Sequence, residues 1–287
     1  MTAGTALRSK SALPVLARPL QLSSEKTAIE TVQLILSENW AQFTLNLAGM
    51  DQKTNGPEIL HQARVGWRRF NSTRQFFKPL LPDLSQLPKE PLHALWVLLG
   101  QVRDMDVALE LTLPAWRDLY VDGDPERRVY WNAMVQTLCM RREQARLTLS
   151  HACRQPDVQI HLQSVSHWID SLHRMSCPAS AQLCGPDFQG WIERRLERLS
   201  RKLAKWSHKD QQKGQHKARI FAKQLRYEVE ILQSILPGKW GDRHLKKAKK
   251  LQADIGWQRD RETACKLVNS LKRYPAIAAF IQTQPLA

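Results

Sequence analysis

Basic side chains in one stretch of the sequence fall at a spacing that suits anion binding. His61, Arg64 and Arg68 follow the spacing i, i+3 and i+7, which places them on one face of an α-helix. Lys78 extends this face, and Arg69 lies to one side of it. The flat guanidinium group of arginine makes paired hydrogen bonds that suit phosphate and carboxylate, and a histidine beside a bound polyanion is held protonated. The stretch therefore predicts a helix face that binds an anion.

The same face occurs a second time, later in the chain. The ten residues "HKARIFAKQL" that begin at His216 match "HQARVGWRRF", the ten that begin at His61. In this copy His216, Arg219 and Lys223 share a helix face, and Arg226 extends it. A charged face that only contacts water is the alternative, but both helices are poor in nearby acids that would form ion pairs along them. We therefore expect two copies of one binding face.

A second repeated block carries pairs of carboxylates. "GQVRDMD" contains Asp104 and Asp106, and "GWQRDRE" contains Asp260 and Glu262 at the matching places. Such pairs can serve acid–base catalysis or bind a metal ion. Because each pair directly follows an arginine, we expect the four acids to orient phosphate-binding arginine and histidine side chains, or to cap a helix junction. A phosphohydrolase that uses these pairs with a divalent metal is the alternative.

The chain as a whole is strongly basic. It has 43 Lys and Arg against 27 Asp and Glu, a formal net charge of +16, and most of the excess lies after residue 154. A charge of this size predicts a polyanionic partner, such as nucleic acid, polyphosphate or an anionic membrane surface. Further basic residues, at helical spacing or in a lysine-rich run, are candidates for the same surface, namely Arg194, Arg198, Arg201, Lys205, Lys247 and Lys250.

Helical periodicity runs through nearly the whole sequence, whereas strand and hairpin patterns are nearly absent. Short connections between long amphipathic helices are typical of antiparallel bundles. The repeated blocks occur in the same order on either side of a linker at 175–187, which predicts an all-α fold of two antiparallel helical bundles, of the four-helix type, related by an internal pseudo-twofold repeat. We expect a flexible N-terminal tail over 1–22 and two half-domains, 23–176 and 177–287, that together form one domain. Helices are predicted over 24–49, 57–78, 90–112, 125–152, 158–175, 187–207, 213–236, 242–255 and 258–273.

Other signals narrow the class of protein. No apolar run reaches the roughly 20 residues that a membrane-spanning helix needs. The five cysteines are odd in number and include no Cys-x-x-Cys pair, which favours reduced thiols in a cytoplasm over disulfides or a zinc site. No glycine-rich phosphate loop or hydrolase motif is present. We expect a cytoplasmic protein without a metal or other cofactor. Its first residues read as a tail rather than a transit peptide, because Pro14 and Pro19 interrupt any amphipathic helix.

Several of these stretches together resemble the conserved histidine α-helical domain, the CHAD family. The similarity covers about residues 24–273 and is carried by "HQARVGWRRF", "LLGQVRDMDVALE", "HKARIFAKQLRYEVEIL" and "LQADIG", in this order. The resemblance implies two four-helix bundles around a central cationic surface that binds inorganic polyphosphate and is not catalytic. By motif position, the family's residues fall on His61, Arg64, Arg68, Arg69, His216, Arg219, Lys223 and Arg226, with Tyr227 in a supporting place.

Two positions depart from the family pattern. Many members carry arginine where this chain has Asn71, and often where it has Gln75, so the first copy is expected to bind more weakly than the second. The chain also shows no Glu-x-Glu-x-Lys segment of the CYTH triphosphatase that some relatives contain. We expect a non-enzymatic module, cytoplasmic or associated with polyphosphate or storage granules, whose partner is inorganic polyphosphate. The alternatives are a nucleic-acid-binding helical protein, a metal-dependent phosphohydrolase, or a scaffold that tethers other proteins to granules.

Overall fold

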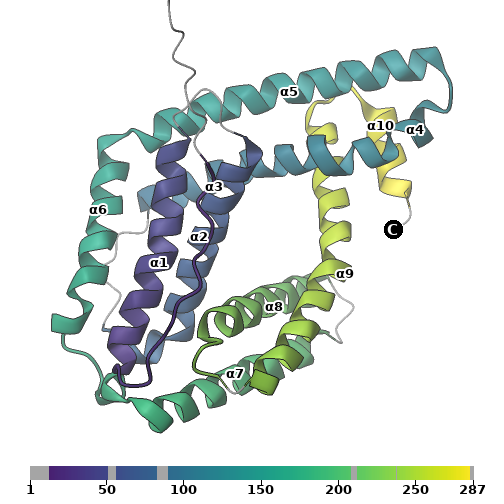
Figure 1. Cartoon of the computed structure of the whole chain (residues 1–287). Helices are drawn as coiled ribbons and strands as arrows, with labels where there is room; N and C mark the ends of the chain where they lie inside the picture. The colour runs from purple at the N-terminus through teal and green to yellow at the C-terminus, as the bar shows by residue number, and fades with distance from the viewer. Residues whose placement is uncertain (1–12, 51–55, 83–89, 208–211, 237, 285–287) are drawn as a thin grey trace, which may run out of the picture.

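The computed structural model describes residues 13–50, 56–82, 90–207, 212–236 and 238–284, and every regular element within these ranges is helical (Figure 1). The predicted all-α class is therefore confirmed. None of the described helices is both long and apolar enough to cross a membrane. The elements are α1 (Ala28–Gly49), α2 (Pro57–Phe76), α3 (Glu90–Val107), α4 (Pro114–Val121), α5 (Pro125–Cys153), α6 (Pro156–Ser171), α7 (Gly185–Ser207), α8 (Gln212–Leu232), α9 (Gly238–Ser270) and α10 (Pro275–Thr283), with a π-helical turn over Ala108–Thr112 and short 3₁₀ turns at Lys78–Leu80, Leu172–Arg174 and Ala179–Gln182.

Capping residues and prolines set the starts of several helices. The Thr27 hydroxyl accepts a hydrogen bond from the backbone N–H of Glu30, and the Glu30 carboxylate accepts one from the N–H of Thr27. This reciprocal pair begins α1. Prolines stand in the first turn of α2, α4, α5, α6 and α10, where a backbone N–H would have no partner within the helix.

The structure differs from the predicted helices at α4, α9 and α10. The segments predicted separately as 242–255 and 258–273 form one continuous helix, α9, because a glycine such as Gly256 is tolerated inside a helix at a cost of about 1 kcal/mol. The short helices α4 and α10 were not predicted. Each begins at a proline that reads as a helix breaker in the sequence but fits a first helical turn.

The helices form two packed groups that share core residues. α1, α2, α3 and α6 stand side by side, with α5 across one end of them, and α7, α8 and the first part of α9 form a second group (Figure 1). A large core joins side chains of both groups, for example Phe77 stacked on Trp191 with ring centroids 5.8 Å apart. A smaller core lies between α4, α5, the last part of α9 and α10. The large core thus spans residue 176, and the domain boundaries stay a prediction.

The repeated halves meet in the middle of the molecule. α2 packs against α8, and α3 packs against α9, so each repeated block faces its matching block, in agreement with the predicted pseudo-twofold arrangement. On its other side α2 approaches α1 closely at Gly66, where a Cβ atom would lie 2.6 Å from the backbone nitrogen of Phe43. Between α2 and α8, the Ser72 hydroxyl donates a 2.6 Å hydrogen bond to Glu228. These contacts hold the two basic helices in place.

Candidate functional site

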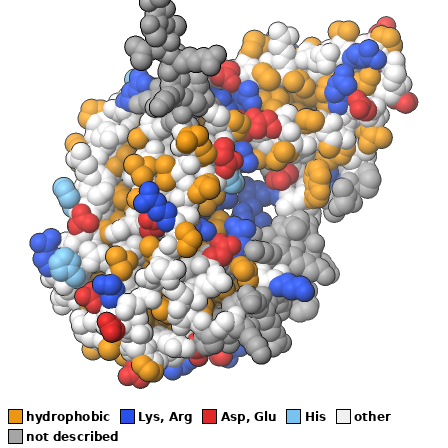
Figure 2. Space-filling view, viewed as in Figure 1, with side chains coloured by type: hydrophobic (Ala, Val, Ile, Leu, Met, Phe, Trp, Pro, Cys, Tyr) orange, Lys and Arg blue, Asp and Glu red, His pale blue; other side chains and the backbone are white. Residues whose placement is uncertain are grey.

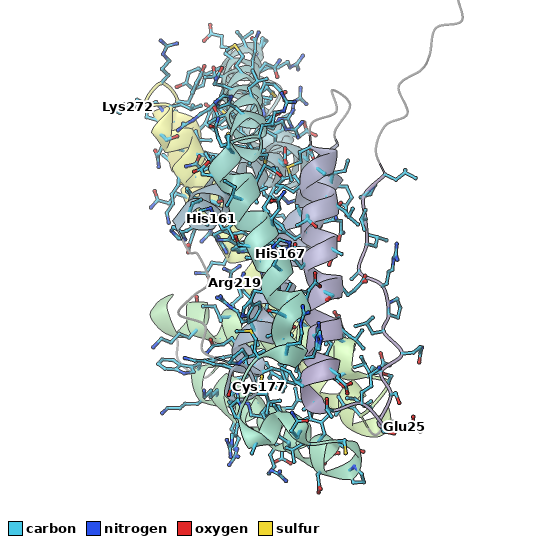
Figure 3. All side chains as sticks on the ribbon, turned by 90° about the vertical axis from the view of Figure 1, so that its left-hand side faces the viewer. Glu25, His161, His167, Cys177, Arg219 and Lys272 are labelled. Atoms are coloured by element: carbon cyan, nitrogen blue, oxygen red, sulfur yellow. The ribbon has the colours of Figure 1, made fainter. Side chains whose placement is uncertain are left out.

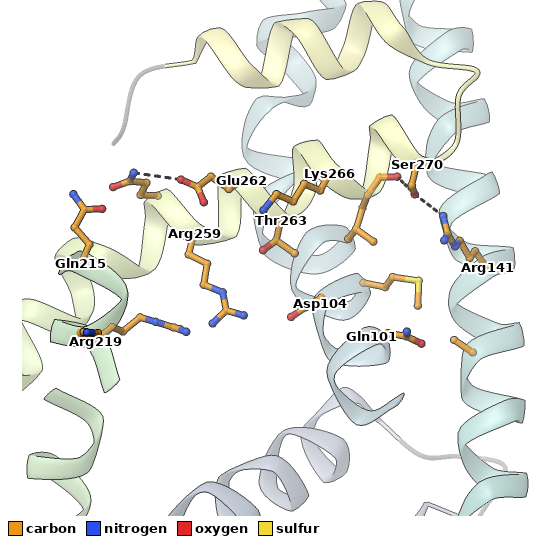
Figure 4. Close-up of a pocket in the computed structure, with 15 residues that line it drawn as sticks. Gln101, Asp104, Arg141, Gln215, Arg219, Arg259, Glu262, Thr263, Lys266 and Ser270 are labelled. Carbon is orange, nitrogen blue, oxygen red and sulfur yellow. Dashed lines mark hydrogen bonds between the residues drawn. The ribbon is translucent and has the colours of Figure 1, made fainter. Parts of the chain in front are cut away.

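Two cavities adjoin each other between the repeated helices. Cavity I, of about 860 Å³, lies between α3, α5, α8 and α9 (Figure 4), and cavity II, of about 680 Å³, lies between α2, α3, α8 and α9. Basic side chains gather in the central hollow of the molecule (Figure 2), and Arg219 lies behind α6 in the side view (Figure 3). The lining of cavity I includes Asp104, Arg141, Arg219, Arg259, Glu262 and Lys266, and that of cavity II includes Arg64, Arg68, Trp96, Asp104, Arg219, Lys223 and Arg259.

Arg64 is a buried cation in the wall of cavity II. Its side chain is only 5% exposed, and its guanidinium carbon lies 4.4 Å from the ring centroid of Trp96. The Nε and Nη1 groups have no hydrogen-bond partner in the protein. Burial, and then repulsion by Arg68, lowers the pKa of Arg64 to about 9, so the group stays charged at neutral pH. A buried charge with free donors is costly to leave unpaired, so this arginine favours an anion in the cavity.

Arg219 and Lys223 on α8 are also basic groups whose pKa values are lowered by burial and by neighbouring cations. Burial, and then the neighbouring Arg259 and Arg68, lowers the pKa of Arg219 to about 10. Burial, followed by repulsion from Arg68 and Arg219, lowers the pKa of Lys223 to about 6, so this amine is mostly neutral at pH 7. A bound polyanion would relieve the repulsion among these groups, because it supplies the negative charge that the walls lack.

Arg69 and Arg226 are already paired. A 3.0 Å ion pair joins Arg69 on α2 to Glu230 on α8, and Arg226 approaches the same carboxylate at 3.7 Å. Both guanidinium groups lie over the ring of Tyr227, at 5.6 and 5.0 Å from its centroid. Tyr227 therefore contacts two of the predicted binding residues, and its supporting role stays a prediction. The Arg69–Glu230 ion pair braces α2 against α8, and both paired arginines have less capacity for an anion than Arg64 or Arg219.

A buried carboxyl group lies behind the same two helices. Glu228 is fully buried, and its Oε1 accepts the hydrogen bond from Ser72 while its Oε2 has no partner in the protein. Burial raises the pKa of Glu228 to about 8, against the lowering effect of Ser72 and Arg69. The group is therefore mostly protonated at neutral pH and adds little negative charge beside cavity II.

Three of the four predicted acids lie beside the cavities. Asp104 lines both cavities, where its charge favours the protonated forms of Arg64 and Arg219. Asp260 interacts with Arg219, and burial raises the pKa of its carboxyl group. Glu262 lines cavity I and accepts a 3.3 Å hydrogen bond from Gln258. The orienting role of these three acids stays a prediction.

The prediction for Asp106 was wrong. Its side chain is fully buried and pairs with Arg146 at 2.8 Å and with Arg142 at 3.7 Å, both on α5. Burial raises the pKa of the carboxyl group, and these two arginines oppose that effect. Asp106 therefore ties α3 to α5 instead of orienting cavity arginines. Among the described residues, no group of three or more His, Cys, Asp or Glu side chains is placed to hold a metal ion.

Comparison with known proteins identifies the family. The family model of the CHAD domain matches residues 34–269. The chain belongs to the CHAD domain family. The crystal structure of the CHAD domain from the plant Ricinus communis has the same fold, with a TM-score of 0.77 at 23% sequence identity, over 94% of this chain and 88% of that one. No curated protein matched the sequence.

The cavities of this CHAD domain do not include all the predicted residues. His61 is half-buried, and burial, with Arg103 next, lowers the pKa of its imidazole, so it is mostly neutral without a ligand. Lys78 is exposed beyond the end of α2. The stripe on α7 is also exposed and lines neither cavity; it consists of Arg194, Arg198, Arg201 and Lys205. The side chains of His216, Lys247 and Lys250 lie outside the described residues.

Two residues of the site were missed by the sequence reasoning. Arg259 lines both cavities and acts electrostatically on Arg64, Arg219 and Lys223. It directly precedes Asp260 in the repeated block, so the repeat itself could have identified it. Trp96 was not among the predicted site residues, yet the Arg64 guanidinium lies over its ring. The repeat does not mark this residue, because the matching position in the second copy is Gln252.

Proposed function

We propose that this CHAD domain binds inorganic polyphosphate in the two adjoining cavities and does so without catalysis. The observation that carries the proposal is the group of cations at the shared wall, in which Arg219 and Arg259 border both cavities and Arg64 keeps free donors. Polyphosphate has about one charge per phosphate and no bases, so it needs several cations along a continuous path and no base-reading group. The family resemblance implies the same ligand.

The acids support a binding role over hydrolysis. Asp106 is occupied by Arg146 and Arg142, whereas Asp104 faces the cavities. The two carboxylates of this block therefore do not act as a pair on one metal ion. We infer a non-enzymatic module, cytoplasmic or granule-associated; an odd number of cysteines without a Cys-x-x-Cys pair fits a reducing compartment. Phosphate release from polyphosphate that depends on a divalent metal and is lost in Asp104→Ala would contradict this.

Nucleic acid is the rival ligand. Single-stranded nucleic acid is generally held by aromatic side chains on which bases stack. In cavity II the Trp96 ring is engaged by Arg64 and lies 6.0 Å from Trp67, nearly parallel to it, so it is a poor platform for a base.

Competition on immobilised polyphosphate decides between the two ligands. We expect long-chain polyphosphate to elute the protein at near-physiological salt, and single-stranded DNA to fail at equal phosphate concentration. Retention should also weaken steeply with salt, because each neutralised phosphate releases a counterion. Elution by DNA at the same concentration as polyphosphate would overturn the proposal.

A further inference from the structure

Lys223 lies among cations without an acid to pair with. It is in the wall of cavity II, one helical turn after Arg219, and no described residue forms a hydrogen bond or an ion pair with it. Its charged surroundings come from every helix that packs around the cavity: Arg68 on α2, Asp104 on α3, Arg219 and Arg226 on α8, and Arg259 and Asp260 on α9. The net charge of this set is positive, which disfavours a protonated amine.

The consequence is a free amine at neutral pH. With a pKa lowered to about 6, about nine tenths of Lys223 is neutral at pH 7, against about one in 2,500 for an ordinary lysine. Only the neutral form has the lone pair that attacks a carbonyl carbon. Lys223 is therefore a nucleophile beside guanidinium groups that can hold a phosphate.

The same cavity also has an apolar wall that polyphosphate does not explain. Ile220, one turn before Lys223, is 48% exposed, and Val97 on α3 is 44% exposed. Both line cavity II together with Trp96. A ligand that combines a phosphate with a small apolar group would use the cations and this wall together.

We propose that cavity II binds acyl phosphates and that Lys223 is their acylation site. The amine nitrogen attacks the acyl carbon and forms the amide bond. The bond from that carbon to the bridging oxygen breaks, inorganic phosphate leaves with the electron pair, and the nitrogen loses its proton to water. The amide cannot be protonated, so Lys223 can no longer become a cation when a polyanion binds. We expect acylation to weaken polyphosphate binding, and this expectation rests on the proposed function. The acylation itself does not depend on that function.

The expected selectivity follows from two opposing effects. The fraction of free amine at pH 7 is roughly 2,000-fold higher than in an ordinary lysine. Nucleophilicity falls with pKa, and a Brønsted slope of about 0.5, as for thiols, makes this loss about 100-fold over four units. Lys223 should therefore react about 20-fold faster than an exposed lysine, before any gain from phosphate binding.

Peptide mass spectrometry after treatment with acetyl phosphate tests the proposal, without polyphosphate present. Lys202, exposed on α7, serves as the internal reference. We expect Lys223 to acetylate at least about tenfold faster at pH 7 and to lose this advantage in urea. Its rate should level off above pH 7, whereas that of Lys202 should keep rising. Equal rates for the two lysines in the folded protein would overturn the proposal, whatever the outcome of the polyphosphate assays.

A second arm tests whether the cavity holds the phosphate. Arg259→Gln should slow acetylation of Lys223 by acetyl phosphate more than acetylation by the N-hydroxysuccinimide ester of acetic acid, which carries no phosphate. The ester corrects for any change in the state of the amine. Inorganic phosphate should compete at Lys223 and not at Lys202. If Arg259→Gln slowed both reagents equally, the acyl phosphate specificity would be wrong. Lys223→Arg, which has no amine to acylate, should remove the modified peptide.

Discussion

Binding of polyphosphate should take up a proton at Lys223. In the free protein the pKa of Lys223 is about 6, lowered first by burial and then by Arg68 and Arg219. A bound polyanion cancels this repulsion and moves the pKa back toward its ordinary value of about 10.4. Between these two values the free protein holds a neutral amine and the complex holds an ammonium group. Close to one proton should therefore be bound at pH 7.5, and affinity should fall as pH rises.

The magnitude is set by linkage. Each pKa unit corresponds to about 1.4 kcal/mol, so the dissociation constant should rise by up to about tenfold per pH unit between pH 7 and 8.5. Below pH 6 Lys223 is protonated in both states and its contribution to this dependence vanishes. Protonation of His61, whose pKa is also lowered by burial, adds to the uptake mainly at the acid end.

Isothermal titration calorimetry in buffers of different ionisation enthalpy counts the protons directly. Wild-type protein at pH 7.5 should give a slope near one proton per protein molecule that binds polyphosphate, because Lys223 lines cavity II alone. Lys223→Met, which removes only the amine, should bring the slope close to zero, whereas Lys202→Met on the exposed face of α7 should leave it unchanged. The reasoning would be refuted by the same slope in wild type and Lys223→Met.

Two further substitutions test the packing that positions the site. Glu228→Gln should stabilise the protein at pH 8 by on the order of 2–4 kcal/mol and have little effect near pH 4.5. The reason is that the raised pKa of Glu228 gives stability that is lost as pH rises toward about 8. Urea unfolding of both proteins at the two pH values measures this, and an equal effect of the substitution at pH 8 and pH 4.5 would contradict it. Gly66→Ala should destabilise by roughly 1–3 kcal/mol, because its Cβ meets the Phe43 backbone. The matched control Gly256→Ala, with nothing within 4 Å of its Cβ, should be neutral or stabilising in thermal unfolding; equal losses in the two variants would contradict the close contact of α1 and α2.

Much of the fold could be predicted because helical periodicity is a local property. The long helices α1, α2, α5 and α7 were predicted to within a few residues of their observed bounds. The prediction failed at glycine and proline, because each of these residue types can either end a helix or lie within one. Gly256 reads as a boundary but lies inside α9, and Pro114 and Pro275 read as breakers but begin α4 and α10.

The repeat marked several of the residues that line cavity II. Arg64 matches Arg219 and Arg68 matches Lys223 in the two copies, and all four line cavity II. The stripe on α7 has equally good helical spacing, but spacing does not reveal whether a face turns toward a cavity or toward water.

Ion pairs between different helices also could not be predicted from the sequence. Arg69 lies on α2, and its partner Glu230 comes from α8, far away along the chain. Asp106 was grouped with Asp104 by the repeat, yet the side chain of Asp106 turns to α5. Side chains that are two residues apart on a helix point in different directions, so their partners can be identified only from the tertiary structure.

The most direct test of polyphosphate binding in the cavities compares two double variants that remove the same charge. Arg219→Gln with Arg259→Gln removes two arginines from the wall shared by the cavities. Arg198→Gln with Arg201→Gln removes two exposed arginines of α7. Fluorescence anisotropy with labelled long-chain polyphosphate measures Kd, and circular dichroism checks that each variant keeps its helices. The cavity variant should lose at least about 100-fold in affinity, since each hydrogen-bonded charge contributes about 1.5–3 kcal/mol. The α7 variant should stay within about threefold of wild type, because exposed charges are screened. Equal losses in the two variants would show that overall charge, and not the cavities, binds the polyanion.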